Sequence, residues 1–262
     1  MWRFTKILFS ILIGALVVWL AYEFLTFPSI SKLRTENPET TSLIEYRLSE
    51  AESDGKKPKK EMIWQPISQI STNLQRAVIA GEDARFFEHE GFDWEAIQKA
   101  WDEAVKEGEK EAKEAGDYDP DSWIPPMPSF KRGASTITQQ LAKNLYLSED
   151  RNFLRKGREA AITYFMEREL SKTRILELYL NVIEWGDGIY GAEAASRHFF
   201  KKSASNLSAA EAAYLAAMIP SPLNVFNPKK NPRRVRARQR ILQKYLRSVR
   251  LPSDGTPRKR RR

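Results

Sequence analysis

The sequence predicts a mostly α-helical domain joined to an N-terminal membrane-spanning helix. Two patterns carry this prediction: an apolar run close to the N-terminus, and apolar residues that recur at steps of three and four along much of the remaining chain. Sustained alternation of apolar and polar residues, which is typical of half-buried strands, is not evident, so little sheet is expected. The length of 262 residues fits one good-sized domain with an appendage, and the hydrophobic content of 42% allows a packed core.

The apolar run covers residues 7–27, which is long enough to cross a membrane, since a helix needs about 20 apolar residues to do so. Its single charge, Glu23, lies near one end, and Arg3 and Lys6 precede it. By the positive-inside rule these two cations hold the N-terminus in the cytoplasm. The alternative is a cleaved signal peptide, but the Leu20–Glu23 stretch offers no cleavage site of small residues. We therefore expect a retained anchor, with everything after Phe27 outside the cytoplasm.

The net charge of +9 suggests an anionic partner, which could be nucleic acid, lipid headgroups or a phosphorylated substrate. A domain outside the cytoplasm makes nucleic acid the wrong partner. The chain has no Cys, so neither a disulfide framework nor a thiolate metal site is expected.

Composition divides the chain into four parts. Residues 1–27 form the cytoplasmic tip and the anchor, and residues 28–64, with their prolines and a Lys-rich run, are interpreted as a connector. Residues 65–250 are expected to form the compact domain. Residues 251–262 end in five consecutive basic residues, which predicts a tail that either keeps the domain soluble or contacts lipid headgroups.

Apolar stripes predict the helices of the domain. The first stripe runs from Ile67 to Val78 along one helix face. Further stripes expected on core-facing helices are Ile137, Leu141 and Leu145; Leu154, Ala161, Ile162 and Phe165; and Ile175, Leu176, Tyr179 and Leu180. Ser208 and Glu211 form a capping-box pattern that opens a helix ending at Met218.

The segment 102–130 is unusual. Residues 102–116 are dense in Glu and Lys at four-residue spacing, which predicts a solvated helix. Residues 117–130 combine four prolines with Trp123, Ile124, Met127 and Phe130, so no regular element is expected there. We interpret this stretch either as a mobile flap or as an apolar wedge that touches lipid.

A first polar cluster, residues 82–91, follows an apolar helical stripe. Glu82 comes three residues after Ile79, so it projects close to the packed face, where partial desolvation would raise its pKa and suit it to general acid or base work. By itself, a Glu–Asp pair at a helix end is more often a cap or a surface pair. A zinc site at Glu82 and His89 is disfavoured, because zinc needs three or four ligands and His198 is the only other histidine.

A second cluster is the segment 133–144. Thr136, Gln140 and Lys143 recur at i, i+4 and i+7 on one face, and such hydroxyl, amide and ammonium donors suit a sugar phosphate. Ser135 is expected to cap the helix, whose N-terminus would then favour an anion. The alternative is a solvated polar face, but adjacent glutamines and an asparagine are less typical of that than Glu and Lys.

A third cluster is the segment 155–159. Arg155 and Glu159 lie one turn apart and are expected to pair. Taken alone this is more often a surface salt bridge on a basic helix. The functional interpretation is a basic clamp on a pyrophosphate with a carboxylate beside it.

Together these segments resemble glycosyltransferase family 51, the peptidoglycan glycosyltransferases, in the expected order over roughly Trp64 to Leu246. Residues 82–91 resemble the motif E-D-x-x-F-x-x-H-x-G, and residues 133–144 resemble G-x-S-T-x-x-Q-Q-x-x-K-N. Residues 155–159 resemble R-K-x-x-E, and residues 174–191 and 212–222 resemble the fourth and fifth motifs. The departure from the pattern is residues 102–130, which look longer than usual.

The resemblance implies a lysozyme-like fold, with a large lobe and a small membrane-facing lobe around a cleft. The chain lacks a transpeptidase domain, so it is similar to the monofunctional form of the Gram-negative inner membrane, with a periplasmic catalytic domain. The implied substrates are lipid II and the growing glycan strand, and undecaprenyl pyrophosphate is the implied leaving group. Cell-wall synthesis or division proteins are further partners to consider.

The resemblance also assigns roles to residues. Glu82 would be the general base on the sugar 4-hydroxyl, and Glu159 the second carboxylate, near the donor pyrophosphate. The cations expected to neutralise the leaving diphosphate are Lys143, Arg155, Lys156 and Arg158. The residues expected to hold sugar and phosphate groups are Ser135, Gln139, Gln140 and Asn144. The substrate-binding set also includes Asp83, Phe86 and His89. These three are expected to shape the first motif rather than to take part in the chemistry.

No cofactor is certain, but a divalent cation, Mg²⁺ or Mn²⁺, could share the pyrophosphate charge. An α-linked donor that gives a β-linked product requires one inversion, hence a single displacement. Two rival functions remain: a lysozyme-like glycan hydrolase, which would have no reason to carry a diphosphate clamp, and a non-catalytic cell-wall scaffold, which would have no reason to keep both carboxylates.

Overall fold

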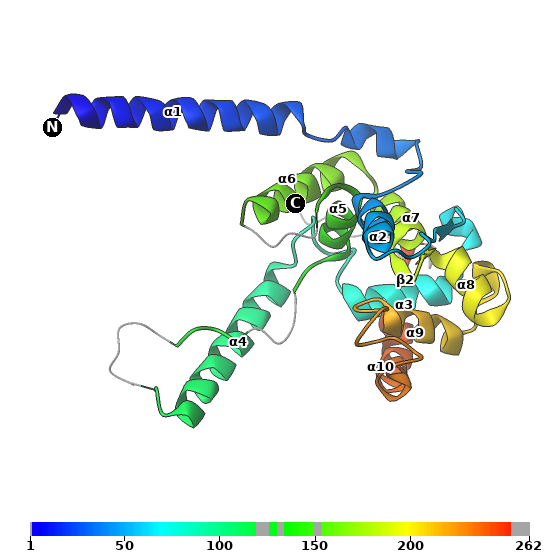
Figure 1. Ribbon diagram of the computed structural model, residues 1–262. Coiled ribbons are helices and arrows are strands. Elements are labelled where there is room, and N and C mark those ends of the chain that lie inside the picture. Colours follow the sequence, from blue (N-terminus) through cyan, green and yellow to red (C-terminus); the bar gives the residue numbers. More distant parts are fainter. Residues whose placement is uncertain (1, 119–125, 130–133, 149–152, 253–262) are drawn as a thin grey trace.

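The structure is a computed structural model that describes residues 2–118, 126–129, 134–148 and 153–252. Its α-helices are α1 (Trp2–Leu25), α2 (Ser42–Ser53), α3 (Thr72–Glu82), α4 (Trp94–Ala115), α5 (Ile137–Tyr146), α6 (Phe153–Glu169), α7 (Lys172–Val182), α8 (Ala192–Phe200), α9 (Ala209–Met218) and α10 (Pro232–Tyr245). Short 3₁₀ helices are η1 (Ile30–Arg34), η2 (Ile67–Gln69), η3 (Ala204–Asn206) and η4 (Leu246–Ser248), and the strands are β1 (Glu61–Met62), β2 (Glu184–Gly186) and β3 (Ile189–Tyr190). The helices surround the small sheet, while α1 and α4 project from the rest of the molecule (Figure 1).

Local capping sets where several helices begin. Ser208 and Glu211 form the expected capping box, and α9 runs from Ala209 to Met218 as predicted. The prediction that one helix begins at Ile67 was wrong. Helix α3 begins at Thr72, because Ser71 caps it by accepting a hydrogen bond from the backbone N–H of Asn73. A capping residue marks the start of its helix, so α3 cannot extend back past Ser71. Ile67 lies instead in the separate η2 helix.

The core lies where α9 packs against both α3 and α10, and where α5 packs against α6 and α7. The stripes predicted on α5 and α7 are buried, as Ile137 and Tyr179 illustrate with no exposed surface. Trp185 is also fully buried, and its indole N–H donates to the carbonyl of Leu215 at 3.0 Å. This contact holds β2 against α9.

The three-stranded sheet has the order β1-β3-β2, with β1 parallel and β2 antiparallel to β3. The turn after β3 needs a glycine at Gly191, where φ is 82° and an added Cβ would lie 2.5 Å from the carbonyl oxygen of Asn181. Asn181 is itself buried and exchanges hydrogen bonds with the backbone of Gln65 at 2.8 Å. The fourth motif therefore holds the beginning of the domain against α7.

The division of the chain at residue 64 stays a prediction, but the segment before it is partly folded onto the domain. Ile30, Leu33 and Ile44 are buried, and α2 packs against α5. Strand β1 adds to the sheet of the domain. The predicted connector thus supplies core residues as well as a link to α1.

The apolar stripe predicted on α6 is not its buried face. Leu154 is 66% exposed and Phe165 is 44% exposed, whereas Ile162 is buried as predicted. The exposed residues line an apolar groove of about 690 Å³ together with Trp19 and Phe27 of the N-terminal segment. A stripe of apolar residues indicates removal from water, and both a protein core and a lipid environment satisfy that requirement.

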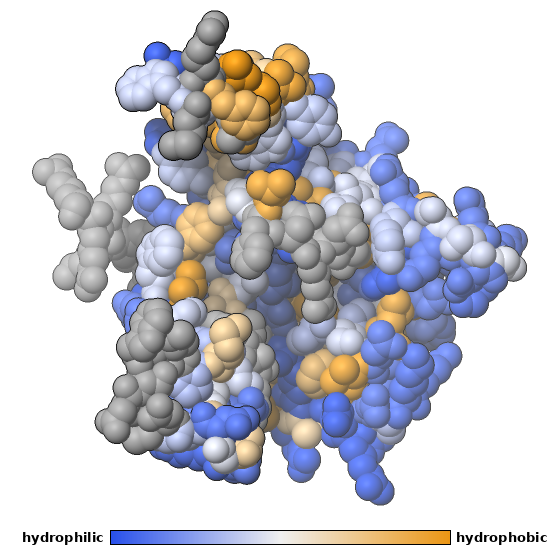
Figure 2. All heavy atoms as spheres, turned by 60° about the vertical axis from the view of Figure 1, so that its left-hand side comes forward, coloured by the Kyte–Doolittle hydropathy of each residue, from blue (hydrophilic) through white to orange (hydrophobic). Residues whose placement is uncertain are grey.

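Helix α1 is long and apolar enough to span a membrane, and no other helix in the described ranges meets that test. Its one acidic residue, Glu23, pairs with Arg158 of α6 at 2.6 Å, and the rings of Phe27 and Phe165 meet edge to face at 5.2 Å. In Figure 2 the apolar residues at the top of the molecule, where α1 lies, stand apart from the largely hydrophilic body below.

The solvated helix predicted over 102–116 is confirmed in α4, most of which is exposed. Its exceptions are Ala104 and Gly108, over which residues 126–129 run: Ser129 donates its backbone N–H to the carbonyl of Ala104 at 2.9 Å. Met127 is 86% exposed at this point. The interpretation of residues 119–125 and 130 as a flap or wedge, and that of the 258–262 tail, lie outside the described residues.

Candidate active site

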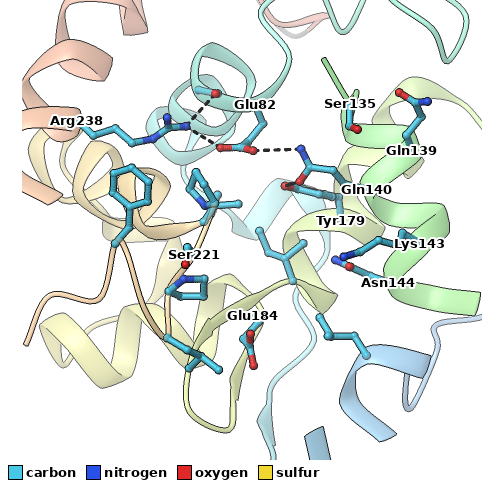
Figure 3. Close-up of a pocket in the computed structure, with 18 of the residues that line it drawn as sticks. Glu82, Ser135, Gln139, Gln140, Lys143, Asn144, Tyr179, Glu184, Ser221 and Arg238 are labelled. Carbon is cyan, nitrogen blue, oxygen red and sulfur yellow. Dashed lines mark hydrogen bonds and ion pairs between the residues drawn. The ribbon is translucent and has the colours of Figure 1, made fainter. Parts of the chain in front are cut away.

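A cavity of about 1020 Å³ opens between the end of α3, helices α5 and α7, strand β2 and helix α10. It is lined by seven of the residues singled out in the sequence: Glu82, Ser135, Gln139, Gln140, Lys143, Asn144 and Glu159. Figure 3 shows the α5 side chains on one side of this cavity and Arg238 of α10 on the other, with Glu82 between them. The motifs, which are far apart in sequence, therefore meet around one space.

Glu82 is the last residue of α3, and its side chain is only 8% exposed. One carboxylate oxygen, Oε1, accepts from the Arg238 guanidinium at 2.9 Å, and the other, Oε2, accepts from the side-chain amide of Gln140 at 3.1 Å. The same guanidinium nitrogen also donates to the carbonyl of Gly81 at 3.0 Å. The carboxylate is thus held in one orientation at the wall of the cavity (Figure 3).

Burial raises the pKa of the Glu82 carboxyl above its usual value, and Arg238 and Gln140 oppose part of that rise. The neighbouring charge of Asp83 adds to it. A carboxyl with a raised pKa is a stronger base once it is ionised, and the paired cation favours ionisation. This confirms the direction expected from the position of Glu82 next to the packed face of α3.

The orientation of the Gln140 amide follows from its second partner. The Tyr179 hydroxyl donates to Gln140 Oε1 at 2.7 Å, so the amide nitrogen must face Glu82. Tyr179 is fully buried, and burial raises its pKa well above the usual value. The phenol is therefore protonated at neutral pH and fixes this hydrogen-bond chain by donating to Gln140.

Helix α5 is capped differently from the expectation. Thr136, not Ser135, is the cap: its side chain accepts from the backbone N–H of Gln139, and the Gln139 side chain accepts from that of Thr136. Thr136 is therefore buried and unavailable to a substrate, whereas Ser135 is left on the cavity wall. The polar side chains of α5 that line the cavity are Gln139, Gln140, Lys143 and Asn144.

Glu159 is the second carboxylate of the cavity, with a side chain only 4% exposed. The predicted pair with Arg155 is confirmed at 3.1 Å, and Lys156 bonds the other carboxylate oxygen. Arg155 and Lys156 are not themselves on the cavity wall as the structure describes it. They place two positive charges directly behind the carboxylate that faces the cavity.

Arg158 does not join this group. Its guanidinium bonds to Glu23 at 2.6 Å and to the carbonyl of Thr26 at 2.6 Å, and it lines the apolar groove beside α1. Arg158 lies three positions after Arg155, but its side chain points toward α1, where its acidic partner Glu23 lies. The structure thus shows Arg158 in contact with the end of α1, and its expected contact with a diphosphate stays a prediction.

Asp83, Phe86 and His89 lie beside the cavity, in the core, and hold its helices together. His89 Nε2 contacts Asp83 at 2.8 Å, and Asp83 also accepts from the first backbone N–H of α5, that of Ile137, at 3.0 Å. Phe86 is fully buried. Asp83 thus ties the end of α3, which carries Glu82, to the start of α5, which carries Gln140.

The residues that come closest to a metal-binding set in the described ranges are Asp83, His89 and Asp93, whose ligand atoms lie within 4.8 Å of one another. His89 Nδ1 accepts from the backbone N–H of Gly91 at 3.1 Å, so Nε2 carries the proton that Asp83 accepts. Asp93 caps α4 through the backbone N–H of Ala96 at 3.0 Å. Each of the three ligands is therefore occupied by a protein partner.

Sequence reasoning missed the cationic partner of Glu82. Arg238 lies 156 residues away, on a helix with so many arginines that composition does not single it out. It also missed Arg47 of α2, which meets Glu184 on the cavity wall at 3.1 Å, because residue 47 falls in the predicted connector. The available signal for Arg238 was its helical spacing, four residues before Leu242 on a face that reaches the core.

Comparison with known proteins shows the family to which the chain belongs. The transglycosylase family profile matches residues 49–115 and 127–247, and it leaves out residues 116–126, which fall in the segment that looked longer than usual. The biosynthetic peptidoglycan transglycosylase of Neisseria gonorrhoeae is 41% identical over 256 residues, which covers 98% of this chain and 100% of that protein. The protein of the same name from Thiobacillus denitrificans is 44% identical over 239 residues, covering 91% and 94%.

These matches span the cavity-lining residues from Gly81 to Tyr245 and most of the chain before them. The mostly helical, lysozyme-like glycosyltransferase fold expected from the sequence is confirmed by them. The chain belongs to the transglycosylase family, among the peptidoglycan transglycosylases of cell-wall synthesis.

Proposed function

We propose that this chain polymerises lipid II into glycan strands by a single inverting displacement, with Glu82 as the general base. The observation that carries the proposal is the position of a buried carboxylate with a raised pKa on the wall of a cavity whose other wall is lined by amide and ammonium donors. In the reaction the acceptor 4-hydroxyl oxygen bonds to the anomeric carbon of the donor. Glu82 takes the hydroxyl proton, and the bond from that carbon to the diphosphate oxygen breaks.

The leaving diphosphate needs positive charge near its oxygens. Lys143 lies on the cavity wall, and Arg155 and Lys156 lie behind Glu159. We propose that these three cations stabilise the leaving group, with Glu159 holding the two on α6 in place until the substrate arrives. Arg158 is left out of this set, because its guanidinium is bonded to α1.

Sugar and phosphate groups would be held by the uncharged polar side chains of the same wall. Ser135 and Asn144 both face the cavity, and Gln140 presents its amide nitrogen toward Glu82. A divalent cation, Mg²⁺ or Mn²⁺, would bind through the diphosphate oxygens and add positive charge beside Lys143. Such ions prefer oxygen ligands, and Glu159 brings a carboxylate to the cavity wall.

We further propose that α1 anchors the enzyme in the inner membrane, with the catalytic domain on the periplasmic side. Ile30 and Leu33, just after α1, are buried in the domain, and Arg158 bonds the end of α1. Cleavage after α1 would remove Glu23, the ion-pair partner of Arg158, which supports an anchor rather than a signal peptide. Protease digestion of spheroplasts tests the orientation: the domain should be degraded without lysis of the membrane.

Lipid II with a fluorescent label, incubated with the detergent-solubilised protein, tests the reaction itself. We expect polymer from the wild-type protein and a loss of about 100-fold or more in Glu82→Gln, since a general base contributes at least that much. Glu45→Gln is the matched control: it makes the same chemical change at an exposed glutamate of α2. Equal polymer from both variants would contradict the role of Glu82, and cleavage of preformed glycan without polymerisation would favour a hydrolase.

A further inference from the structure

Positive charge is concentrated in one segment. Residues 229–250 contain ten Lys and Arg and no Asp or Glu, so this segment alone carries more positive charge than the whole chain, whose net charge is +9. Most of the segment is α10, which runs from Pro232 to Tyr245 and continues into η4. The proposed reaction uses one of these cations, Arg238.

The other cations of the segment include a stripe of five, which we call the cationic stripe: Arg233, Arg236, Arg240, Lys244 and Arg247. Their spacing of three, four, four and three residues places them within about a quarter of the helix circumference. All five are exposed, and none forms an ion pair with another described residue. The stripe ends at a shallow cavity of about 760 Å³ lined by Lys244, Arg247 and Arg250.

The opposite side of α10 belongs to the candidate active site. Arg238, Ile241, Leu242 and Tyr245 line the cavity that holds Glu82. One helix therefore forms a wall of the cavity with one face and exposes a row of unpaired cations on the other. A polymer that leaves the cavity over the rim of α10 would meet this row directly.

A lipid surface is a poorer partner for the stripe. A helix that lies in a membrane interface inserts an apolar face. On α10, Val235 and Leu242 are buried in the core, and the exposed apolar residues, Ile241 and Tyr245, line the cavity that holds Glu82 and not the side of the cationic stripe. The large apolar residues exposed elsewhere, such as Trp94, Met127 and Leu154, lie on or beside α4 and α6. In Figure 1 α10 lies at the bottom and α1 at the top, and the lower part of Figure 2, at the height of α10, is mostly hydrophilic.

We infer that the cationic stripe is a docking surface for the glycan strand itself, which it holds through the carboxylates of the stem peptides. This inference rests on the proposed function, because it takes the strand to be the product. Carboxylates repeat along such a strand, and single exposed ion pairs are weak and screened by salt. Several such ion pairs in a row would retain the polyanionic strand between successive additions of lipid II and still let it move through the site.

Direct binding tests the surface without turnover. The probe is soluble, uncrosslinked glycan strand that carries its stem peptides, and the same strand stripped of peptides is the chemical control. The variant is Arg236→Gln, Arg240→Gln and Lys244→Gln combined, since Gln keeps the helix propensity. The matched control protein carries Lys32→Gln, Lys57→Gln and Lys99→Gln, which removes the same charge from exposed positions elsewhere.

We expect the α10 variant to bind the peptide-bearing strand about tenfold more weakly at low salt, as several exposed charge pairs are lost together. The control variant should bind like the wild type, and stripped strand should bind weakly to all three. In polymerisation assays the α10 variant should consume lipid II within about twofold of the wild-type rate but release shorter strands.

Equal binding of peptide-bearing strand by the wild type and the α10 variant would overturn the inference. So would loss of binding to anionic phospholipid vesicles while strand binding is unchanged, because the stripe would then serve the membrane. A wild type that binds strand through the stripe but makes no polymer would support the docking surface and contradict the proposed function.

Discussion

Arg238→Gln is the substitution that most directly tests how the pKa of Glu82 is set. The change keeps a side chain that can hydrogen-bond but removes the positive charge 2.9 Å from the carboxylate. Without that charge, burial acts on Glu82 unopposed by its main ionic partner, so its pKa rises further. A base must be ionised to accept a proton, so activity at a given pH falls until the pH exceeds the raised pKa.

The size of the effect follows from the geometry. Unit charges about 4 Å apart interact by about 4 kcal/mol at an effective dielectric constant of about 20. Arg238 is 26% exposed, so part of that is screened. A hydrogen bond to a charged group contributes roughly 1.5 to 3 kcal/mol, which corresponds to about 10- to 100-fold in rate below the pKa of the base.

The assay is the initial rate of lipid II polymerisation as a function of pH, with thermal unfolding measured on the same samples. We expect the acid limb of the profile to move to higher pH in Arg238→Gln, with the rate recovering at alkaline pH. Arg238→Lys should restore part of the shift, because it keeps the charge. Arg234→Gln, an exposed arginine on the same helix, is the control. A uniform loss of rate with an unmoved acid limb would refute the reasoning, since Arg238 would then act only in substrate binding or folding.

Three further predictions follow from single contacts. Glu159→Gln should lower the rate and reduce the free energy of unfolding by about 3 kcal/mol, because it leaves the two cations of α6 without their buried partner; single-turnover kinetics and urea unfolding measure both. Asp83→Asn should cost about 1 to 3 kcal/mol of stability through its lost bonds to His89 and α5, with KM unchanged in the fraction that is folded. Gly191→Ala should be strongly destabilising at its φ of 82°, whereas Gly157→Ala, in open space on α6, should stabilise by up to about 1 kcal/mol in the same unfolding assay.

The features that depend on neighbouring residues could be predicted from the sequence. The capping box of α9, the buried stripes of α5 and α7 and the apolar length of α1 all matched, because each is decided within a few turns of chain. The motif residues Glu82, Gln140 and Lys143 were found in the same way, and the structure brings them to one cavity. The capping of α5 by Thr136 rather than Ser135 was missed, since both residues are good caps and only packing selects one.

The remaining features were decided by tertiary structure, because they depend on which distant residue comes close in space. The apolar stripe of α6 could face a core or a lipid, and only the position of α1 beside Phe165 distinguishes the two. From the sequence, Arg158 could contact either a diphosphate or Glu23. In the structure α1 packs on α6 and places Glu23 within ion-pair distance of Arg158. Sequence alone determined that this chain has an apolar helix long enough to span a membrane, a helical domain and a carboxylate beside a set of polar donors. Folding decided that Arg238 is the cation paired with that carboxylate, since electrostatic attraction depends on distance in space and helical spacing alone does not say which distant carboxylate Arg238 meets.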